Sequence, residues 1–212
     1  MRTYSIVKVF GTIQGEGALA GTPAAFVRFG GCNMWSGEEA HRERDAERNE
    51  AACPLWCDTD FKPQERITAT EILWRITALG ARPLIVLTGG EPMLQVDDEL
   101  LDALCTVRAR VQIETNGTVE PRFSYRPYVH VTLSPKVARA RIKLAQADEL
   151  KLVWPAYVAE EWVSFPARQR FLQPQADFDG RNPENEAKLV EYVQSHGDWR
   201  LSLQTHKILG VE

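Results

Sequence analysis

Short apolar runs alternate with amphipathic segments along most of this chain. Several runs are rich in β-branched residues and are short, as buried strands tend to be. They predict strands at residues 5–10, 24–29, 84–88, 111–115, 129–133, 149–153, 170–173 and 200–204. Strands that alternate with helices form βαβ units, so a mostly parallel sheet is expected.

Helices are predicted at residues 68–79, 97–108 and 183–196, where apolar side chains recur at helical spacing. Gly80 follows the first as a stop signal, and Asn182 and Pro183 suit the cap and first turn of the third. Cys105 falls on the apolar side of the second helix, where we expect a core residue.

The length of the chain limits the fold. A complete eightfold barrel takes about 250 residues, and this chain has 212. We therefore expect one domain over residues 1–212, with an α/β fold. Its architecture is predicted to be a partial, incomplete TIM-type barrel of about six parallel βα units.

Residues 36–52 differ from the rest of the chain. Positions 38–50 are polar, carry mixed charges and offer no core face. We interpret this stretch as a helical or loop insert exposed to solvent, with binding of a partner as the alternative.

The amino-acid composition limits the kinds of partner that this protein is expected to bind. Lys and Arg total 25 against 29 Asp and Glu, for a net charge of −4. Nucleic-acid binding is therefore not expected, because such domains are usually basic. No apolar run approaches the roughly 20 residues of a membrane span, and no signal-peptide core opens the chain. We expect a cytoplasmic protein, in which cysteines are ligands, catalysts or core residues rather than disulfides.

Three cysteines form a candidate metal site early in the chain. Cys32, Cys53 and Cys57 have polar neighbours and lie near the glycines at 30–31. A structural zinc site needs four ligands, and only His41, inside the charged stretch, could be the fourth. Three thiolates can instead hold a four-iron cluster with one iron open. The cysteines alone leave both choices open.

A second signal favours the iron–sulfur interpretation. Residues 88–92 read Thr-Gly-Gly-Glu-Pro, directly after the apolar run at 84–87. Glu91, at a strand end, suits the amino group of a small ligand that binds the open iron. Together with the cysteines, this turn indicates an enzyme that reduces S-adenosylmethionine and performs radical chemistry.

The chain resembles the radical S-adenosylmethionine enzymes and, within them, is similar to the 7-carboxy-7-deazaguanine synthases of the queuosine pathway. The turn at 88–92 marks the superfamily, whereas Gln-Gly-Glu-Gly at 14–17 and Cys-Asp-Thr at 57–59 are typical of this family. The resemblance runs nearly end to end, through residues 12–17, 28–33, 57–60, 88–92, 114–117, 134–136, 149–151, 173–174 and 204–207.

The resemblance implies a [4Fe-4S] cluster on Cys32, Cys53 and Cys57. Two spacings depart from the usual pattern: residues 33–52 make a long first gap, which the charged insert explains, and residues 54–56 make the second gap one residue longer. The implied S-adenosylmethionine site comprises Trp56, Cys57, Asp58, Gly90, Glu91, Glu114, Ser134, Pro135, Lys136, Gln173, Pro174, Gln175 and Ala176. Asn116 follows Glu114 as a further candidate.

The implied substrate is 6-carboxy-5,6,7,8-tetrahydropterin. Glu16 can accept two N–H donors of the pterin edge, and Arg28 can pair bidentately with the carboxylate. The implied substrate site comprises Ile13, Gln14, Gly15, Glu16, Arg28, Thr88, His206 and Glu212. Thr59, beside the last cysteine, would bind Mg²⁺, which prefers hard oxygen ligands and few from the protein.

The implied reaction uses a 5′-deoxyadenosyl radical as its reactive agent and no catalytic side chain. The pterin ring contracts to 7-carboxy-7-deazaguanine and ammonia leaves. A flavodoxin- or ferredoxin-type electron donor and a homodimer are also implied. Two alternatives remain open: an activating enzyme for a glycyl-radical partner and a non-catalytic zinc-bound module.

Overall fold

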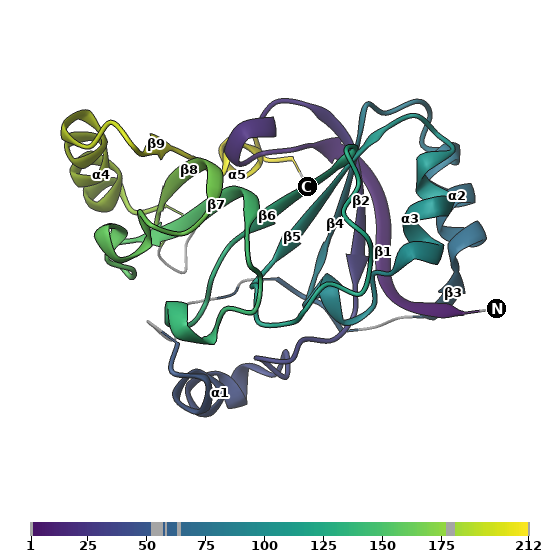
Figure 1. The fold of residues 1–212 in the computed structure, drawn as a ribbon, viewed down its shortest axis with the longest axis horizontal. Coiled ribbons are helices and arrows are strands. Elements are labelled where there is room, and N and C mark those ends of the chain that lie inside the picture. The colour runs from purple at the N-terminus through teal and green to yellow at the C-terminus, as the bar shows by residue number, and fades with distance from the viewer. Residues whose placement is uncertain (1, 52–56, 58, 63–64, 177–180, 212) are drawn as a thin grey trace.

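The computed structural model describes residues 2–51, 57, 59–62, 65–176 and 181–211. In this part of the chain, nine strands form one open sheet in the order β3-β1-β2-β4-β5-β6-β7-β8-β9 (Figure 1). The strands are β1 (Thr3–Ile13), β2 (Pro23–Phe29), β3 (Glu65–Thr68), β4 (Leu84–Gly89), β5 (Arg110–Thr115), β6 (Val129–Leu133), β7 (Ala147–Trp154), β8 (Ala167–Pro174) and β9 (Arg200–Leu201).

The sheet is parallel except at its N-terminal end. β1 pairs antiparallel with both β2 and β3, whereas every pair from β2–β4 to β8–β9 is parallel. The predicted partial barrel is confirmed: the sheet is largely parallel and does not close. The pattern missed β3 as a strand, and β9 covers only two residues of the predicted 200–204.

The predicted helices form close to their expected bounds, as α2 (Ala69–Ala78), α3 (Asp98–Cys105) and α4 (Pro183–Ser195). Each begins at a side-chain cap: Thr68, Asp97 and Asn182 each accept a backbone N–H three residues on. A short α5 (Thr205–Leu209) follows β9. The connections from β5 to β8 contain turns and 3-10 segments and no α-helix, so the described chain has fewer complete βα units than the predicted six.

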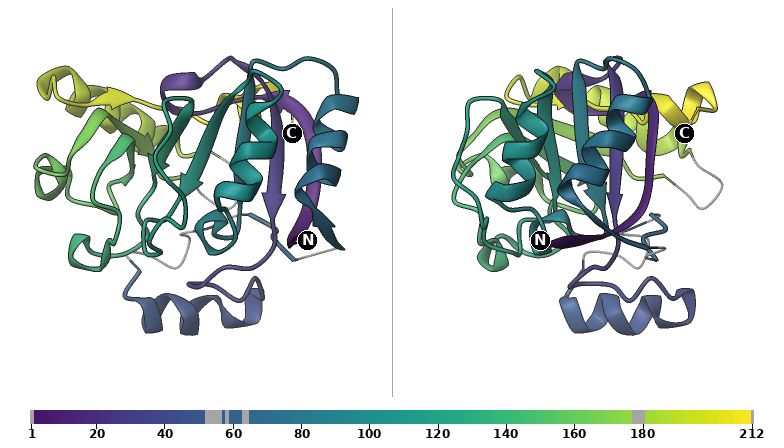
Figure 2. Two further views of the ribbon diagram at one scale, coloured as in Figure 1. Left: turned by 45° about the vertical axis from the view of Figure 1, so that its right-hand side comes forward. Right: turned by 90° about the vertical axis from the view of Figure 1, so that its right-hand side faces the viewer.

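The helices α2 and α3 cover one face of the sheet (Figure 2). Their apolar residues meet alternate strand residues such as Val27, Leu87 and Ile113, all fully buried. Cys105 is exposed, so its predicted core position is wrong. It is the last residue of α3, where the buried stripe formed by Leu100, Leu101 and Leu104 ends.

Successive strand side chains point to opposite faces. The residues between the core positions therefore project to the other side, here called the inner face. These residues are largely polar and include Arg28, Thr88, Gln112, Glu114, Thr132, Glu149, Lys151 and Gln173. A polar face enclosed by a curved sheet is a place for polar ligands rather than a second core.

The charged insert contains α1 (Arg42–Asn49), which lies beyond the lower edge of the sheet in Figure 1. The expectation of no core face is wrong, because Arg42, Asp45, Ala46 and Asn49 are buried. Ala46 belongs to a small separate core with Met34, Trp35, Phe61 and Val137. The burial of the polar members was hard to predict from the sequence, because each of them forms a hydrogen bond to a residue outside the helix.

Among the described residues, no helix is long and apolar enough to span a bilayer.

Candidate active site

The Gly-Gly-Glu-Pro turn packs directly on the loop that carries Cys32. The Gly90 N–H donates to the Phe29 carbonyl at 3.0 Å, and the Glu91 N–H donates to the Gly31 carbonyl at 2.9 Å. A Cβ on Gly90 would overlap the Gly31 carbonyl oxygen, so only glycine permits this approach. The two strongest sequence signals therefore belong to one structural unit at the end of the parallel strands β2 and β4.

Glu91 is fully buried behind this turn. Its Oε1 accepts hydrogen bonds from the Thr115 hydroxyl at 2.7 Å and the Met93 N–H at 2.9 Å, and its Oε2 accepts from the Asn116 N–H at 2.8 Å. Burial raises the pKa of Glu91 to about 7, against the lowering effect of these three donors. A carboxylate has about four acceptor positions, so it retains capacity for an ammonium while it joins the ends of β4 and β5.

Cys32 and Cys57 both pack against the small core of the insert. Burial raises the pKa of the Cys32 thiol to about 11, with further raising by Glu91 and Cys57 and lowering by backbone N–H groups. Two half-buried thiols beside a glycine loop suit a cluster that binds thiolates. No group of three metal-binding side chains occurs among the described residues. Cys53, Trp56 and Asp58 lie outside them, so the complete ligand set stays a prediction.

Further candidates for the cofactor site lie where β5 and β6 end. The Lys136 ammonium donates to the Ser134 hydroxyl at 3.3 Å, and Pro135 between them is buried. Asn116 Nδ2 donates to Asn33 Oδ1 at 3.3 Å, which connects this edge to the cysteine loop. Parallel strands bring these residues to the same end of the sheet as Glu91. Thr59 is half-buried, and its predicted role as a magnesium ligand stays a prediction.

A buried hydrogen-bond network occupies the middle of the inner face. Gln14 Nε2 donates to Gln112 Oε1 at 2.7 Å and to Glu114 Oε1 at 3.3 Å. Gln112 Nε2 in turn donates to Glu114 Oε1 at 2.9 Å and to Thr132 Oγ1 at 3.0 Å. Two strands distant in sequence, β5 directly and β6 through Gln112, thus orient the Gln14 amide, which the resemblance assigned to the substrate.

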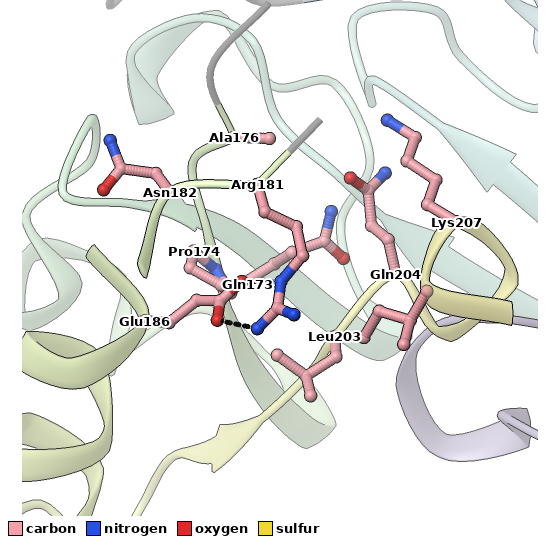
Figure 3. A pocket seen from close by; sticks show the side chains of 10 residues that line it. Gln173, Pro174, Ala176, Arg181, Asn182, Glu186, Leu203, Gln204 and Lys207 are labelled. Carbon is pink, nitrogen blue, oxygen red and sulfur yellow. Dashed lines mark hydrogen bonds and ion pairs between the residues drawn. The ribbon is translucent and has the colours of Figure 1, made fainter. Parts of the chain in front are cut away.

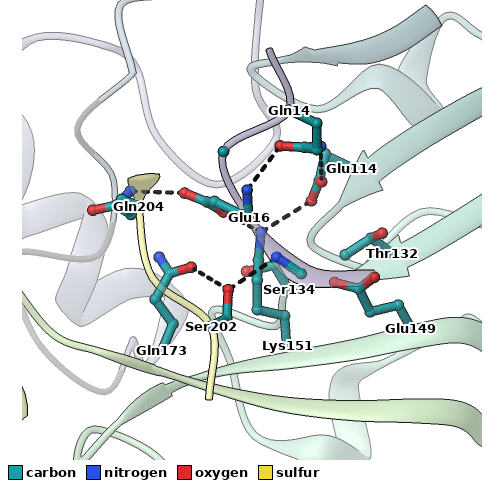
Figure 4. Close-up of polar contacts among 12 residues, drawn as sticks. Gln14, Glu16, Glu114, Thr132, Ser134, Glu149, Lys151, Gln173, Ser202 and Gln204 are labelled. Atoms are coloured by element: carbon teal, nitrogen blue, oxygen red, sulfur yellow. Dashed lines mark hydrogen bonds and ion pairs between the residues drawn. The ribbon is translucent and has the colours of Figure 1, made fainter. Parts of the chain in front are cut away.

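Glu16 lies beside this network, between two protein donors (Figure 4). Its Oε2 accepts from the Lys151 ammonium, and its Oε1 accepts from Gln204 Nε2 at 2.8 Å. Lys151 also contacts Glu114 Oε2 at 3.3 Å. Burial alone would raise the pKa of Glu16, but the charge and hydrogen bond of Lys151 dominate and lower it to about 2. Glu16 is therefore a carboxylate throughout the physiological range.

The backbone of residues 15–18 is fixed from three sides. The Gly17 N–H donates to Ser202 Oγ at 3.0 Å, and the Ala18 N–H donates to Glu149 Oε2 at 3.0 Å. The Thr205 N–H and hydroxyl both donate to the Gly15 carbonyl, at 3.0 and 2.9 Å. A Cβ on Gly15 would overlap the His206 ring. The structure thus brings His206 next to the predicted substrate loop. Glu212 lies outside the described residues.

Arg28 and Thr88 are register partners on β2 and β4, and both side chains are half-buried. The Arg28 guanidinium carbon lies 5.4 Å from the centroid of the Phe10 ring. Its Nε is buried and has no hydrogen-bond partner among the described residues. A buried donor without a partner is costly, so an anionic ligand here would satisfy it. Ile13 ends β1 and is half-buried.

A pocket opens where β8 ends, and Gln173, Pro174 and Ala176 form part of its wall (Figure 3). Gln204 and Lys207 line it from the C-terminal segment, and Arg181 and Glu186 form an ion pair within it. The Gln175 N–H donates to the Trp154 carbonyl at 2.8 Å, which holds this segment beside β7. Three of the four predicted cofactor residues from 173 to 176 therefore share one cavity.

For several groups at the centre of the network, the sequence predicted no functional role. Gln112, Thr132 and Glu149 are fully buried, and Lys151 is 5% exposed. The available signal was their alternation with apolar residues in strands, as in Val-Gln-Ile-Glu-Thr at 111–115. A barrel interior explains that alternation, which resembles the pattern of a solvent-exposed strand.

Curated relatives match this chain over almost its whole length. It is 41% identical over 222 residues to a 7-carboxy-7-deazaguanine synthase of Bradyrhizobium diazoefficiens, with 99% of each chain covered. It is 39% identical over 225 residues to the synthase of Nitratidesulfovibrio vulgaris, again with 99% of each covered. For the synthase of Bordetella pertussis, the identity is 40% over 222 residues, which cover 98% of this chain and 99% of the relative.

The fold also resembles a solved structure. The crystal structure of QueE from Escherichia coli superposes with a TM-score of 0.69 at 25% identity, over 95% of this chain and 93% of the other. A scan against protein-family models found no match.

Proposed function

Because this chain belongs to the 7-carboxy-7-deazaguanine synthase family, we propose that it makes 7-carboxy-7-deazaguanine in queuosine biosynthesis by radical S-adenosylmethionine chemistry. The substrate proposed is 6-carboxy-5,6,7,8-tetrahydropterin. The observation that carries the proposal is the backbone contact between the Cys32 loop and the Gly-Gly-Glu-Pro turn, through the Glu91 N–H and the Gly31 carbonyl. It lies at the end of a sheet whose inner face is rich in acceptors.

The inner face offers what a pterin edge requires. Such an edge presents amino and ring N–H donors beside a carbonyl. Glu16 supplies a carboxylate, and Gln14 supplies an amide whose orientation Gln112 and Glu114 fix. Arg28 is the cation that the substrate carboxylate would meet, and its Nε supports this role because no described residue satisfies it.

Cys32 and Cys57, with Cys53, would hold a [4Fe-4S] cluster, and Glu91 with Gly90 would receive the methionine end of S-adenosylmethionine. When bound, cluster and cofactor supply the hydrogen-abstracting radical. Ser134, Lys136 and the pocket at Gln173 would hold the rest of the cofactor. The task of these residues is to keep the reacting carbon within reach and to exclude water and oxygen.

Other features of the proposal rest on the family resemblance. Thr59 would contribute one oxygen ligand to Mg²⁺, with the remaining ligands from substrate and water. A flavodoxin- or ferredoxin-type protein would supply the electron, and the enzyme would work as a cytoplasmic homodimer.

Anaerobic turnover tests the proposal. The purified enzyme is given a reconstituted cluster, S-adenosylmethionine, Mg²⁺ and a reductant. It should then convert carboxy-tetrahydropterin to 7-carboxy-7-deazaguanine, which chromatography and mass spectrometry detect. An intact cluster without this product would refute the assignment and favour the activating enzyme of a glycyl-radical partner. A colourless protein that contains zinc would favour the non-catalytic module.

Cysteine variants test the metal site separately. Cys57→Ala should abolish cluster assembly, whereas Cys105→Ala, at the exposed end of α3, should retain full iron content. Equal iron in the two variants would remove Cys57 from the ligand set.

A further inference from the structure

We propose that Lys151 is a positioning residue of the substrate site, which holds the Glu16 carboxylate in place for a 2-amino-4-oxopyrimidine edge. This inference rests on the proposed function and adds a residue to it. The Lys151 ammonium contacts Glu16 Oε2 and lies 3.3 Å from Glu114 Oε2 (Figure 4). One buried cation thus connects the N-terminal substrate loop to the network on β5.

The charges around Lys151 explain why a cation is needed there. Its side chain is 5% exposed, and those of Glu16 and Glu114 are 16% and 18% exposed. Glu149, two residues earlier on the same strand face, is fully buried. Two carboxylates so close in a buried site cannot both stay ionised without compensation. The pKa of Lys151 is raised by these three carboxylates despite burial.

Geometry favours positioning over a merely structural role. Glu16 is held at one oxygen by Lys151 and at the other by Gln204, 2.8 Å away. Each carboxylate oxygen has a second acceptor position, so one remains on each for the paired N–H donors of the heterocycle. The loop itself is already fixed by Ser202 and Glu149, which contact the backbone at Gly17 and Ala18. Lys151 therefore orients the side chain rather than the loop.

Binding measurements test the inference. The holoenzyme with S-adenosylmethionine is titrated anaerobically with 7-carboxy-7-deazaguanine in a calorimeter. Lys151→Met should weaken binding about 30-fold or more, the usual effect of removing one partner from a buried charge pair. Lys151→Arg should retain binding, and Lys151→Gln, a donor without charge, should resemble Lys151→Met. The matched control is Lys188→Met, which removes an exposed lysine from α4.

The dependence of product affinity on pH is a second measurement, which a purely structural role of Lys151 would not change. The charged and titratable groups that face Glu16 and Lys151 are Glu114, Glu149, His130 and His206. Without the ammonium, Glu16 should take up a proton as the pH falls from 8 to 5.5, and the protonated oxygen then no longer accepts an N–H of the heterocycle. The ratio of wild-type to Lys151→Met affinity should therefore rise over that range.

A second substitution keeps the test decisive. Glu114→Gln in the Lys151→Met background removes one of the competing carboxylates and should restore much of the affinity. Equal affinity and pH profile in wild type and Lys151→Met would overturn the inference, and so would an identical response to Lys151→Arg and Lys151→Gln. If no Lys151 variant folds, the residue is structural and the inference is wrong. A wild-type holoenzyme that does not bind the product would instead count against the proposed function.

Discussion

The guanidinium of Arg42 donates a 2.7 Å hydrogen bond to the carbonyl oxygen of Cys57. The same group lies 4.2 Å from the centroid of the Trp35 ring, close to Cys32 in sequence. Asn49, about two turns further along the same face of α1, donates to the Met34 carbonyl at 2.6 Å. The helix α1 of the charged insert thus connects the loop around Cys32 to the segment around Cys57.

Arg42→Ala should loosen the cysteine segment, because it removes both the hydrogen bond to Cys57 and the cation–π contact with Trp35. We expect faster alkylation of Cys32 and Cys57 in the cluster-free protein, measured by mass spectrometry. We also expect lower iron retention after reconstitution, measured by metal analysis. Arg48→Ala changes an exposed arginine of the same helix and serves as the control. Indistinguishable alkylation rates for the two variants would mean that α1 does not support the segment.

Gly90→Ala should destabilise the fold by about 3 kcal/mol or more, since the added methyl overlaps a backbone carbonyl that cannot move alone. Urea unfolding of the cluster-free protein measures the change. At Gly197 an added Cβ meets no atom within 4 Å, so Gly197→Ala should change stability by less than about 1 kcal/mol. A tolerated Gly90→Ala would show that the turn and the cysteine loop are not in contact.

The ion pair of Glu16 predicts a specific dependence of stability on pH. Its pKa is lowered from 4.5 to about 2. The contribution, about 3 kcal/mol from this shift, is complete above pH 4.5 and is lost as the pH falls toward 2. The difference in free energy of unfolding between wild type and Glu16→Gln should follow that curve. Glu184→Gln, which disrupts an exposed pair with Lys188, should show little difference at any pH; a flat curve for Glu16 would show that Lys151 does not stabilise its charge.

Arg28→Lys should raise KM for the carboxylated pterin with a smaller effect on kcat, because a lysine cannot reproduce the bidentate fork. We expect a KM increase of about 10-fold or more, from the loss of charge-assisted hydrogen bonding. Steady-state kinetics under anaerobic conditions provide the measurement. Arg110→Lys, at an exposed position on β5, controls for the change of residue type. An unaltered KM for Arg28→Lys would place the substrate carboxylate elsewhere.

The parallel strands and three helices could be predicted because their signals are local. Apolar runs, caps such as Asn182 and the stop at Gly80 act within one turn of the chain. The Gly-Gly-Glu-Pro turn could also be recognised from the sequence, because its motif is continuous in the chain, whereas the close approach of Gly90 to Gly31 became apparent only in the structure. The membership of the family followed from such motifs, and relatives matched over 98–99% of the chain confirm it.

The rest depended on contacts between distant residues. The buried face of α1 could not be predicted, because Arg42 is buried only where Trp35 and Cys57 meet it. Cys105 had the right spacing for the core, yet α3 ends at that residue. Lys151 looked like an ordinary strand residue until its partners, 135 and 37 positions away, were known.

The contacts that fix the predicted substrate loop at residues 15–18 also limit when this loop can fold during synthesis. Gly17 meets Ser202, and Glu16 meets Gln204, across separations of 185 and 188 residues. At about 5–20 residues per second, a ribosome takes roughly 10–40 s to span that interval. The cysteine segment and β4 emerge early, but the acceptor loop remains unfinished on the nascent chain. An incompletely translated copy therefore carries candidate cluster ligands while the predicted substrate loop still lacks its contacts with the C-terminal segment.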